Sequence, residues 1–366
     1  MKSLVTRYGL SLALSLCLSN AYAQQEDVMG DVPQDAAQNM LSSPSLMQSS
    51  SVSYAQGPVE MSRNLRGFAK DLIQLDRPAI SVSSNPTLEE WKTILSNRGW
   101  WDQDQIWSEE LWTETVKKVQ HAYGLTEDGK TGSQLLGSIS ASDKNVANAL
   151  NVWADHVDEA VRKAREAGHQ KIIIVNLPSY TLHAIDLVSG KTIVESRVIV
   201  GTAAHKTPRM VTNVVNLKLN PDWTPTARMK RGGKRYVPAG PRSPLGKVRF
   251  STDNNLSIYL HHTNEEKLFD LSSRAKSSGC IRVEDWQDVA SFVAQTTNQE
   301  VEDWVSNGKT RFIKVEKVPV WMSYSLVDLV GAGAGVYPDI YAEGNKAIGK
   351  AALTEQPQQP IIVPEF

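Results

Sequence analysis

The chain has 366 residues, which is long enough for about two domains with linkers. Hydrophobic residues make up 41% of the sequence and charged residues 22%, as is typical of a globular protein that folds in water. The formal net charge is -1 at pH 7, and this balance argues against a protein that binds nucleic acid.

Residues 1–23 have the pattern of a secretory signal peptide. Lys2 and Arg7 precede a short apolar run, and the "AYA" sequence of Ala21–Ala23 fits a cleavage site. The apolar run is about half as long as a membrane-spanning helix. We therefore expect cleavage after residue 23, secretion, and no membrane span in the mature chain. An uncleaved N-terminal anchor is the alternative.

Two further segments have the composition of linkers. Residues 24–80 are rich in Gln, Ser, Asn, Asp and Met and have few periodic apolar positions. Such a segment buries too little apolar surface to offset the entropy lost on ordering it. We expect a flexible linker there, and a second flexible segment in the Gln- and Pro-containing tail at residues 348–366.

A small helical domain is predicted at residues 81–141. Thr87 and Glu90 have the spacing of a capping box at the start of its first helix. Apolar residues recur at the period of one helical face over about residues 108–123. The sequence "EDGKTG" at residues 127–132 is typical of a turn, and a third, short helix follows it.

One long amphipathic helix is predicted next. Apolar residues keep a single face over residues 142–167, and Gly168 is placed to end the helix. We expect this segment, residues 142–169, to connect two domains.

From Lys171 the apolar period changes from that of a helix to that of a strand. A buried strand and a hairpin come first, and short strands are predicted at residues 211–219, 247–251, 257–261 and 310–315. Many strands, few helices and no βαβ alternation indicate an α+β protein with a β-sandwich-like domain. We place this domain at residues 170–316 and a C-terminal extension at residues 317–347.

Cys280 is the only cysteine outside the first 23 residues, so the mature chain cannot form an internal disulfide. A lone cysteine is most often a buried, inert side chain, but its neighbours favour catalysis. Gly279 lets a substrate approach the backbone, and Ser277 and Ser278 favour a turn. Such a turn can direct backbone N–H groups at a developing oxyanion.

A nucleophilic cysteine also needs a base, because the thiolate is the reactive species. The sequence "IYLHHT" ends an apolar strand with His261 and His262, upstream of Cys280. A strand end holds an imidazole more rigidly than a loop does. We expect His261 to be the base, and His262 to orient it through its backbone carbonyl.

The two motifs "IYLHHT" and "SSGCIRV" together resemble the signature of the L,D-transpeptidases, the cysteine enzymes with the YkuD-type fold. The resemblance covers about residues 170–315 and includes "VIVGTAAHKTP" at 198–208 and "LNPDW" at 219–223. It implies a catalytic domain with these candidates: His261 and Cys280 as base and nucleophile, Ser277, Ser278 and Gly279 as the oxyanion turn, and Arg282, His262, Tyr259 and Trp223 as substrate-binding residues.

The chain departs from the family pattern at three places. Ser278 stands where many members have His. A serine at this position is typical of the larger Gram-negative members. His262 stands where Asp, Gly or Ser is usual. The segment 224–243, where that subgroup has a long capping insertion, is only about twenty residues long, which puts substrate discrimination by a lid in doubt.

The segment "TVKKVQHAYGLTEDGKTGSQLLGSI" resembles the small peptidoglycan-binding module found beside many wall enzymes. A helical spacer that binds nothing is the alternative, because the motif residues mainly build turns and core. The pattern matches at Gln120, Gly124, Leu125, Asp128, Gly129, Gly132 and Leu135.

The resemblance implies a periplasmic L,D-transpeptidase that acts on peptidoglycan stem peptides. A tetrapeptide donor would acylate Cys280 with release of D-Ala, and a diaminopimelate amine would resolve the thioester into a 3-3 crosslink. Water, a D-amino acid or a lipoprotein lysine are alternative acceptors, and an inactive wall-binding protein is the alternative of another class. We expect no cofactor and no metal site. The sequence does not indicate the oligomeric state.

A papain-like protease is disfavoured, because there the cysteine precedes the histidine. Eight basic residues and no acid lie between residues 228 and 249. Our hypothesis is that they form a surface that meets substrate carboxylates, and a solvated basic loop is the alternative. Arg282 is the first candidate for a direct carboxylate contact, because a guanidinium binds a carboxylate through two parallel hydrogen bonds.

Overall fold

The computed structural model describes residues 54–55, 57–102, 104–331, 333–344 and 348–349. The predicted signal peptide and most of the flexible tail lie outside the described residues. The described residues belong to one compact unit, Tyr54–Phe366. Among them, no helix is long and apolar enough to cross a membrane.

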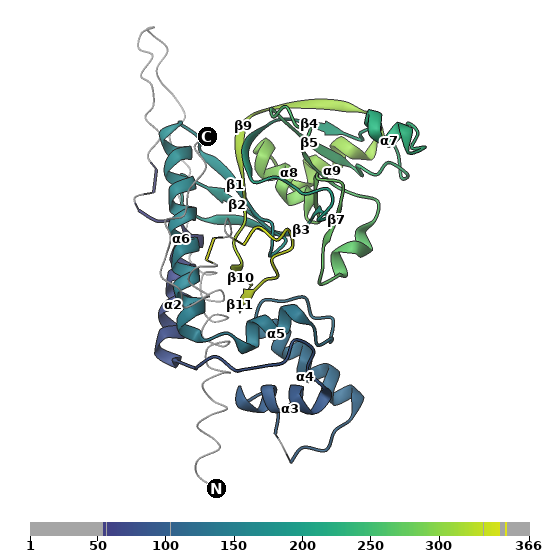
Figure 1. Ribbon diagram of the computed structural model, residues 1–366. Helices are drawn as coiled ribbons and strands as arrows, with labels where there is room; N and C mark the ends of the chain where they lie inside the picture. The colour runs from purple at the N-terminus through teal and green to yellow at the C-terminus, as the bar shows by residue number, and fades with distance from the viewer. Residues whose placement is uncertain (1–53, 56, 103, 332, 345–347, 350–366) are drawn as a thin grey trace, which may run out of the picture. The chain divides into compact units, whose positions relative to one another are not determined.

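The structure confirms a mixed α+β fold, in which helices α2–α6 precede a large sheet along the chain (Figure 1). It differs from the expected linker at residues 24–80, where helix α2 covers Glu60–Leu75. Its buried residues include Met61, Leu65, Ala69 and Leu72, which form one stripe at helical spacing. The polar composition around this short stripe concealed it in the sequence.

Helix α6 spans Asp143–Glu166 and packs along α2 (Figure 1). Ser142 caps it, with its side chain accepting from the Asn145 N–H at 3.3 Å. Together the two helices cover Ile172, Ile174 and Ile185 on the outer face of the sheet. The predicted connecting helix is therefore part of a packed layer.

Three short helices build a second, smaller core: α3 (Leu88–Asn97), α4 (Glu109–Ala122) and α5 (Ser133–Ser140). The Thr87 capping box of α3 is confirmed, since the Glu90 N–H donates to Thr87 Oγ1 at 3.3 Å and the Thr87 N–H donates to Glu90 Oε2 at 2.6 Å.

The C-terminal hairpin of β10 (Val327–Val330) and β11 (Gly333–Val336) packs onto these helices. Gly124 has a φ of +62°, and a Cβ there would lie 2.5 Å from the Gly333 carbonyl oxygen. Tyr337 joins the small core, and its hydroxyl donates to the Gly124 carbonyl at 3.1 Å. Gly124 is thus required both for the helix end and for close contact with the hairpin.

The main sheet closes on itself, because β2 pairs with β1 at one end of the strand order and also with β3 near the other. The order is β2-β1-β9-β4-β5-β6-β8-β3-β7. The bounds are β1 Lys171–Asn176, β2 Thr181–Asp186, β3 Thr192–Gly201, β4 Met210–Leu219, β5 Val248–Thr252, β6 Leu260–His261, β7 Ala275–Ser277, β8 Ile281–Val283 and β9 Arg311–Ser323.

This barrel-like sheet confirms the expected sandwich-like architecture and encloses the main hydrophobic core with α8 (Trp286–Ala294) and α9 (Asn298–Ser306). The expected domain boundary at residue 316 lies inside β9. The second half of that strand pairs with both β1 and β4, so the sheet continues to Ser323.

Candidate active site

The turn that carries Cys280 joins β7 to β8 and is fixed by the hydroxyl of Ser277. This hydroxyl donates to the Cys280 carbonyl at 2.6 Å and accepts from the Gly279 N–H at 3.0 Å. The Gly279 amide is therefore already engaged, whereas the Cys280 N–H makes no hydrogen bond within the described part of the chain. Ser278 is exposed at the outside of the turn.

Gly279 is required by the backbone conformation of this turn. Its φ is +117°, a region that side chains disfavour, and a Cβ would lie 3.2 Å from Ile258 Cδ1. Its carbonyl accepts from Thr207 Oγ1 at 2.8 Å, and the same hydroxyl accepts from the Gly201 N–H at 2.8 Å. The segment after β3 therefore supports the turn from behind.

His261 ends β6, and its ring is oriented by the next residue. Its Nδ1 is hydrogen-bonded to the His262 carbonyl. A carbonyl only accepts, so Nδ1 carries the proton and Nε2 has the free lone pair. The main chain thus holds His261 in the tautomer that a general base needs.

The backbone carbonyl of His262 thus orients His261 as expected, and its imidazole makes contacts of its own. Its Nδ1 accepts from the Lys247 N–H at 3.1 Å, its Nε2 lies 3.2 Å from Glu266 Oε1, and its ring packs against Trp286. Only 6% of the residue is exposed. Because these contacts engage the ring within the chain, the side chain of His262 supports the strand and is not available to bind substrate.

Strand register places three cationic or titratable side chains in a row across the sheet. Arg249 of β5 lies opposite His261, and His261 lies opposite Arg282 of β8. The alternate residues Phe250, Leu260 and Ile281 face the main core. Because side chains alternate along a strand, the row and Cys280 belong to the other face, outside the core.

The other substrate-binding candidates are placed differently. Tyr259 lies beside His261, with ring centroids 6.3 Å apart. Arg282 is bound within the chain, since its Nη1 donates to Glu265 Oε2 at 2.6 Å. Trp223 pairs through its backbone with Val237, at the base of the segment that carries α7 (Ala227–Arg231). Among the described residues, no hydrogen bond joins Trp223 to Cys280 or His261.

The electrostatics favour a neutral cysteine–histidine pair. Burial, together with the electrostatic effects of Arg282, His262 and Arg249, lowers the pKa of His261 to about 3. Burial raises the pKa of the Cys280 thiol, against the opposing effects of a Tyr259 hydrogen bond and the two arginines. The thiol donates to the Ser257 carbonyl at 3.7 Å. At neutral pH the resting site thus holds a thiol and an uncharged imidazole.

Residues 170–320 match the model of the YkuD family, described as the L,D-transpeptidase catalytic domain. This segment is therefore similar to L,D-transpeptidase catalytic domains. A putative L,D-transpeptidase of Haemophilus influenzae is 27% identical in an alignment 220 residues long, which covers 46% of this chain and 44% of the relative. The probable L,D-transpeptidase YcfS of Escherichia coli is 37% identical in an alignment 99 residues long, which covers 25% of this chain and 30% of the relative. The chain spans less than half the length of these relatives.

Solved structures of L,D-transpeptidases are similar at low sequence identity. The enzyme of Stackebrandtia nassauensis has 15% identity and a TM-score of 0.30, over 74% of this chain and 97% of that one. The E. faecium catalytic domain acylated by ertapenem has 19% identity and a TM-score of 0.27, over 42% and 96%. The family assignment rests on the family match and the curated relatives.

The sequence did not identify Tyr341 as a residue that supports the transpeptidase site. Its hydroxyl donates to the Gly201 carbonyl at 2.8 Å and accepts from the Thr207 N–H at 3.1 Å. Tyr341 is 3% exposed and stacks on Tyr324. The chain of contacts from Tyr341 through Thr207 to Gly279 ties the C-terminal extension to the nucleophile turn.

We expect Tyr341→Phe to lower kcat roughly tenfold, because loss of the hydroxyl loosens the segment behind Gly279 and misplaces the thiol. The unfolding free energy should fall by only about 1–2 kcal/mol, as for two lost hydrogen bonds. Steady-state kinetics and urea unfolding measure the two effects. An unchanged kcat, or a change in KM alone, would contradict a positioning role.

The pKa directions predict how the thiol reacts with a neutral reagent. The alkylation rate of Cys280 with iodoacetamide should rise with pH and reach its midpoint above the ordinary thiol value of about 8.5. His261→Asn should leave that midpoint nearly unchanged, because no ion pair is lost. A reactive plateau below pH 7 that disappears in His261→Asn would instead reveal a thiolate–imidazolium pair.

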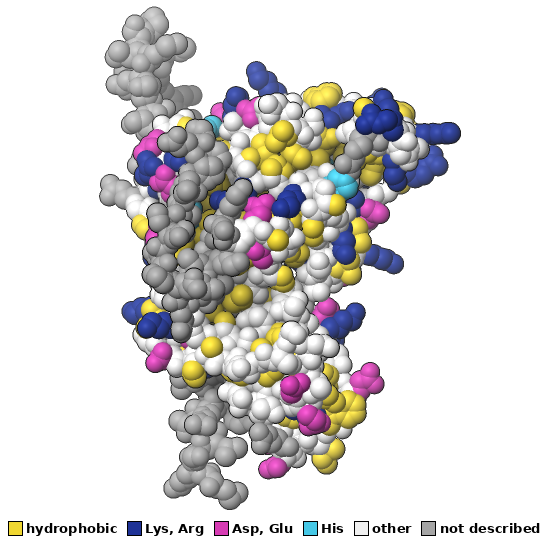
Figure 2. Space-filling view, viewed as in Figure 1, with side chains coloured by type: hydrophobic (Ala, Val, Ile, Leu, Met, Phe, Trp, Pro, Cys, Tyr) yellow, Lys and Arg dark blue, Asp and Glu magenta, His cyan; other side chains and the backbone are white. Residues whose placement is uncertain are grey.

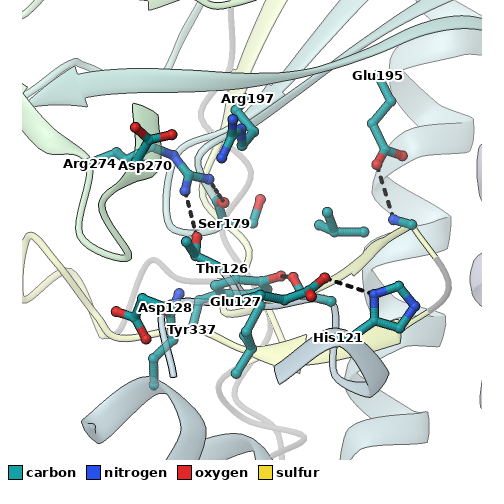
Figure 3. Close-up of a pocket in the computed structure, with 15 residues that line it drawn as sticks. His121, Thr126, Glu127, Asp128, Ser179, Glu195, Arg197, Asp270, Arg274 and Tyr337 are labelled. Atoms are coloured by element: carbon teal, nitrogen blue, oxygen red, sulfur yellow. Dashed lines mark hydrogen bonds and ion pairs between the residues drawn. The ribbon is translucent and has the colours of Figure 1, made fainter. Parts of the chain in front are cut away.

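A cavity of about 460 Å³ lies elsewhere, between the α4–α5 turn, the C-terminal hairpin and the transpeptidase domain (Figure 3). Its charges are largely satisfied within the chain. Arg274, which is 5% exposed, donates to Thr126 Oγ1 at 2.9 Å, and His121 Nδ1 lies 2.8 Å from Glu127 Oε1. Neither Cys280 nor His261 lines the cavity. We therefore interpret the cavity as a junction between packed parts of the protein.

In the helical segment, residues of the motif that resembles a wall-binding module have structural roles. Gln120 Nε2 donates to Asp128 Oδ1 at 2.7 Å, and its Oε1 accepts from the Gly129 N–H at 2.9 Å. These bonds fix the turn at Gly129, whose φ is +70°. Glycan binding by this segment remains a prediction.

Among the described residues, no group of histidine, cysteine and acidic side chains has the arrangement of a metal site.

Proposed function

We propose that this protein is a periplasmic L,D-transpeptidase that forms 3-3 crosslinks between peptidoglycan stem peptides. The observation that carries the proposal is the placement of Cys280, in a glycine turn directly before β8, next to strand β6, which ends in His261 with its tautomer fixed. The family match of residues 170–320 supports the reaction class. The signal-peptide pattern of the N-terminus supports export.

Acylation begins from a neutral thiol. Substrate binding turns Cys280 Sγ from the Ser257 carbonyl toward His261, and Nε2 takes the proton as sulfur attacks the carbonyl of the residue before the terminal D-Ala. The C–S bond forms and the carbonyl becomes an oxyanion. The Cys280 N–H donates to this oxygen, because the Gly279 N–H is held by Ser277.

Collapse of the tetrahedral intermediate breaks the bond to D-Ala. The imidazolium of His261 returns its proton to the departing amine, which leaves a thioester on Cys280. The side-chain amine of a second diaminopimelate attacks the thioester and loses a proton to His261. This step restores the thiol and completes the crosslink. Water, a D-amino acid or a lipoprotein lysine can resolve the same acyl-enzyme. These reactions share the acylation step and differ only in the acceptor.

A basic surface near the site supports the proposal that the substrate is anionic. Figure 2 shows Lys and Arg side chains gathered over the segment of α7, and residues 230–236 are all exposed. The segment leads through Lys247 and Arg249 into β5, next to His261. Stem peptides carry several carboxylates, which such a surface attracts over about one Debye length.

The test is incubation of the full chain with disaccharide-tetrapeptide, followed by mass spectrometry. Loss of D-Ala with appearance of a 3-3 linked dimer is expected. Tripeptide alone would indicate the hydrolase, and D-amino acid exchange would appear when a labelled D-amino acid is added. Absence of every product, with Cys280→Ala indistinguishable from the unmodified protein, would refute the enzyme and leave a wall-binding role.

A further inference from the structure

The geometry points to Arg249 as the residue that binds the free terminal carboxylate of the leaving amino acid. This inference rests on the proposed transpeptidase function and names a recognition contact within it. Arg249 lies directly opposite His261 on the neighbouring strand, on the face that carries Cys280. It makes the enzyme selective for peptides whose scissile bond is the last one in the chain.

Arg282, the candidate from the sequence, is already bound by an acid of the same chain. Its Nη1 lies 2.6 Å from Glu265 Oε2, and its side chain is only 14% exposed. A substrate carboxylate at Arg282 would have to displace Glu265. This competition makes Arg282 a poor primary receptor and leaves it as a source of positive charge beside His261.

Arg249 differs because no carboxylate contacts it among the described residues. Its Nε and Nη2 donate to Ser251 Oγ at 3.2 and 3.1 Å, and its guanidinium lies over the Tyr259 ring at 5.1 Å. These contacts hold the planar group in one orientation. Its Nη1 makes no hydrogen bond to any described residue, so donors remain for a carboxylate ligand.

The charge of Arg249 acts at the reacting atoms. It is among the groups that lower the pKa of both Cys280 and His261, so it lies close enough to influence them electrostatically. In a substrate whose last bond is cleaved, the terminal carboxylate is two bonds from the scissile nitrogen. A cation beside the nucleophile and base is therefore within reach of this carboxylate.

A second carboxylate has the same chemistry, namely the one on the side chain of diaminopimelate, on the acyl side of the scissile bond. The position of Arg249 favours the leaving side. Arg249 lies next to His261, and this base has to protonate the departing amine, whose own residue carries the terminal carboxylate. Amidated substrates separate the two sources.

The experiment measures kcat/KM of the full chain for D-Ala release from three tetrapeptides: the free acid, the form amidated at the terminal carboxylate, and the form amidated at the diaminopimelate side chain. We expect the unmodified protein to favour the free acid over the terminal amide by about 10- to 100-fold, as for a lost charged hydrogen bond. Arg249→Gln should reduce this ratio to near one, and Arg249→Lys should give an intermediate ratio.

Arg162→Gln is the matched control. It removes the same charge from an exposed position on α6, where Arg162 forms ion pairs with Glu159 and Glu166, and it should leave the ratio unchanged. Arg249→Gln with an unchanged acid-to-amide ratio would overturn the assignment. Loss of discrimination only against the side-chain amide would assign Arg249 to diaminopimelate and overturn it equally.

Binding provides a readout that does not require turnover. In a Cys280→Ala background, calorimetry should show tighter binding of the acid than of the terminal amide, and Arg249→Gln or Arg249→Lys should reduce that difference. Equal binding of the two peptides before the Arg249 change would overturn the inference. A protein that discriminates in binding but releases no D-Ala would refute the proposed function and leave the Arg249 contact supported.

Discussion

Replacement of Cys280 by alanine is expected to lower D-Ala release to background, a loss of roughly 10⁴- to 10⁶-fold by analogy with removal of other covalent nucleophiles. Without sulfur no thioester forms, and the remaining turn and His261 only position substrate. Intact-protein mass spectrometry after incubation with tetrapeptide measures this directly. The unmodified protein should gain the mass of the acyl group, and the alanine variant should not.

The alanine variant should remain folded, because Cys280 is only partly buried and its sulfur makes one weak hydrogen bond in the described structure. His261→Asn is the complementary variant. It keeps a side chain of similar size and should lose turnover while Cys280 is still alkylated by iodoacetamide. Turnover that survives Cys280→Ala would show that another residue is the nucleophile.

The candidate pair Cys280 and His261 could be predicted from the sequence because its signals are local. A glycine beside the only cysteine of residues 24–366 and a histidine at the end of an apolar strand each point to a conformation that neighbouring residues determine. The α+β class also followed from local periods of apolar residues. Helix α2 was missed because its short stripe lies among polar residues, and its stability comes from contact with α6, which is distant in sequence.

Arg249 and Tyr341 could not be assigned from sequence for a different reason. The position of Arg249 beside His261 depends on strand register, and the hydrogen bonds of Tyr341 to Gly201 and Thr207 join segments about 140 residues apart. Arg282 looked like the better carboxylate receptor until the structure placed Glu265 against it. Competition between partners of one guanidinium is a property of the folded chain.

Asp328→Ala is expected to cause the largest loss of stability among the changes considered, about 3–5 kcal/mol in unfolding free energy. Asp328 is fully buried in β10 and accepts from Trp153 Nε1 at 3.0 Å, Asn176 Nδ2 at 3.0 Å and Ser179 Oγ at 2.7 Å. Alanine leaves these buried donors without an acceptor. Urea unfolding followed by tryptophan fluorescence measures the loss.

The imidazole of His183 adds to the effect. Its Nε2 lies 4.0 Å from Asp328 Oδ2, and its Nδ1 lies 3.6 Å from Glu195 Oε2. Burial opposes a charge on His183, but the two carboxylates outweigh it and raise the pKa of this histidine. Burial likewise opposes the charge of Asp328, but His183 and the hydrogen-bond donors lower its pKa. Removal of Asp328 therefore also removes the main group that favours the protonated form of His183.

The pH dependence has a definite sign. A carboxyl whose pKa is lowered in the folded state stabilises the protein above its unfolded pKa, near 4, and this stabilisation decreases as pH falls. The stability difference between the unmodified protein and Asp328→Ala should thus be largest near neutral pH and decrease below about pH 4. A difference that does not change with pH would show that the ionised carboxylate is not the stabilising group.

Asp253→Ala is the matched surface control. Asp253 also accepts several hydrogen bonds, from Thr212 and Asn213, but it lies near solvent, so its replacement should cost no more than about 1 kcal/mol. An equal loss for Asp253→Ala would mean that burial of the Asp328 network adds nothing.

The two variants of the C-terminal extension should differ in kind. Asp328 joins the β10–β11 hairpin to α6 and β1, whereas Tyr341 contacts the segment behind the nucleophile turn. Asp328→Ala should therefore lower stability while kcat, measured well below the unfolding temperature, stays near that of the unmodified protein. Tyr341→Phe should show the reverse pattern. If both variants lost kcat in proportion to stability, the extension would act on the site only through global folding, and the separate path from Tyr341 to Gly279 would be refuted.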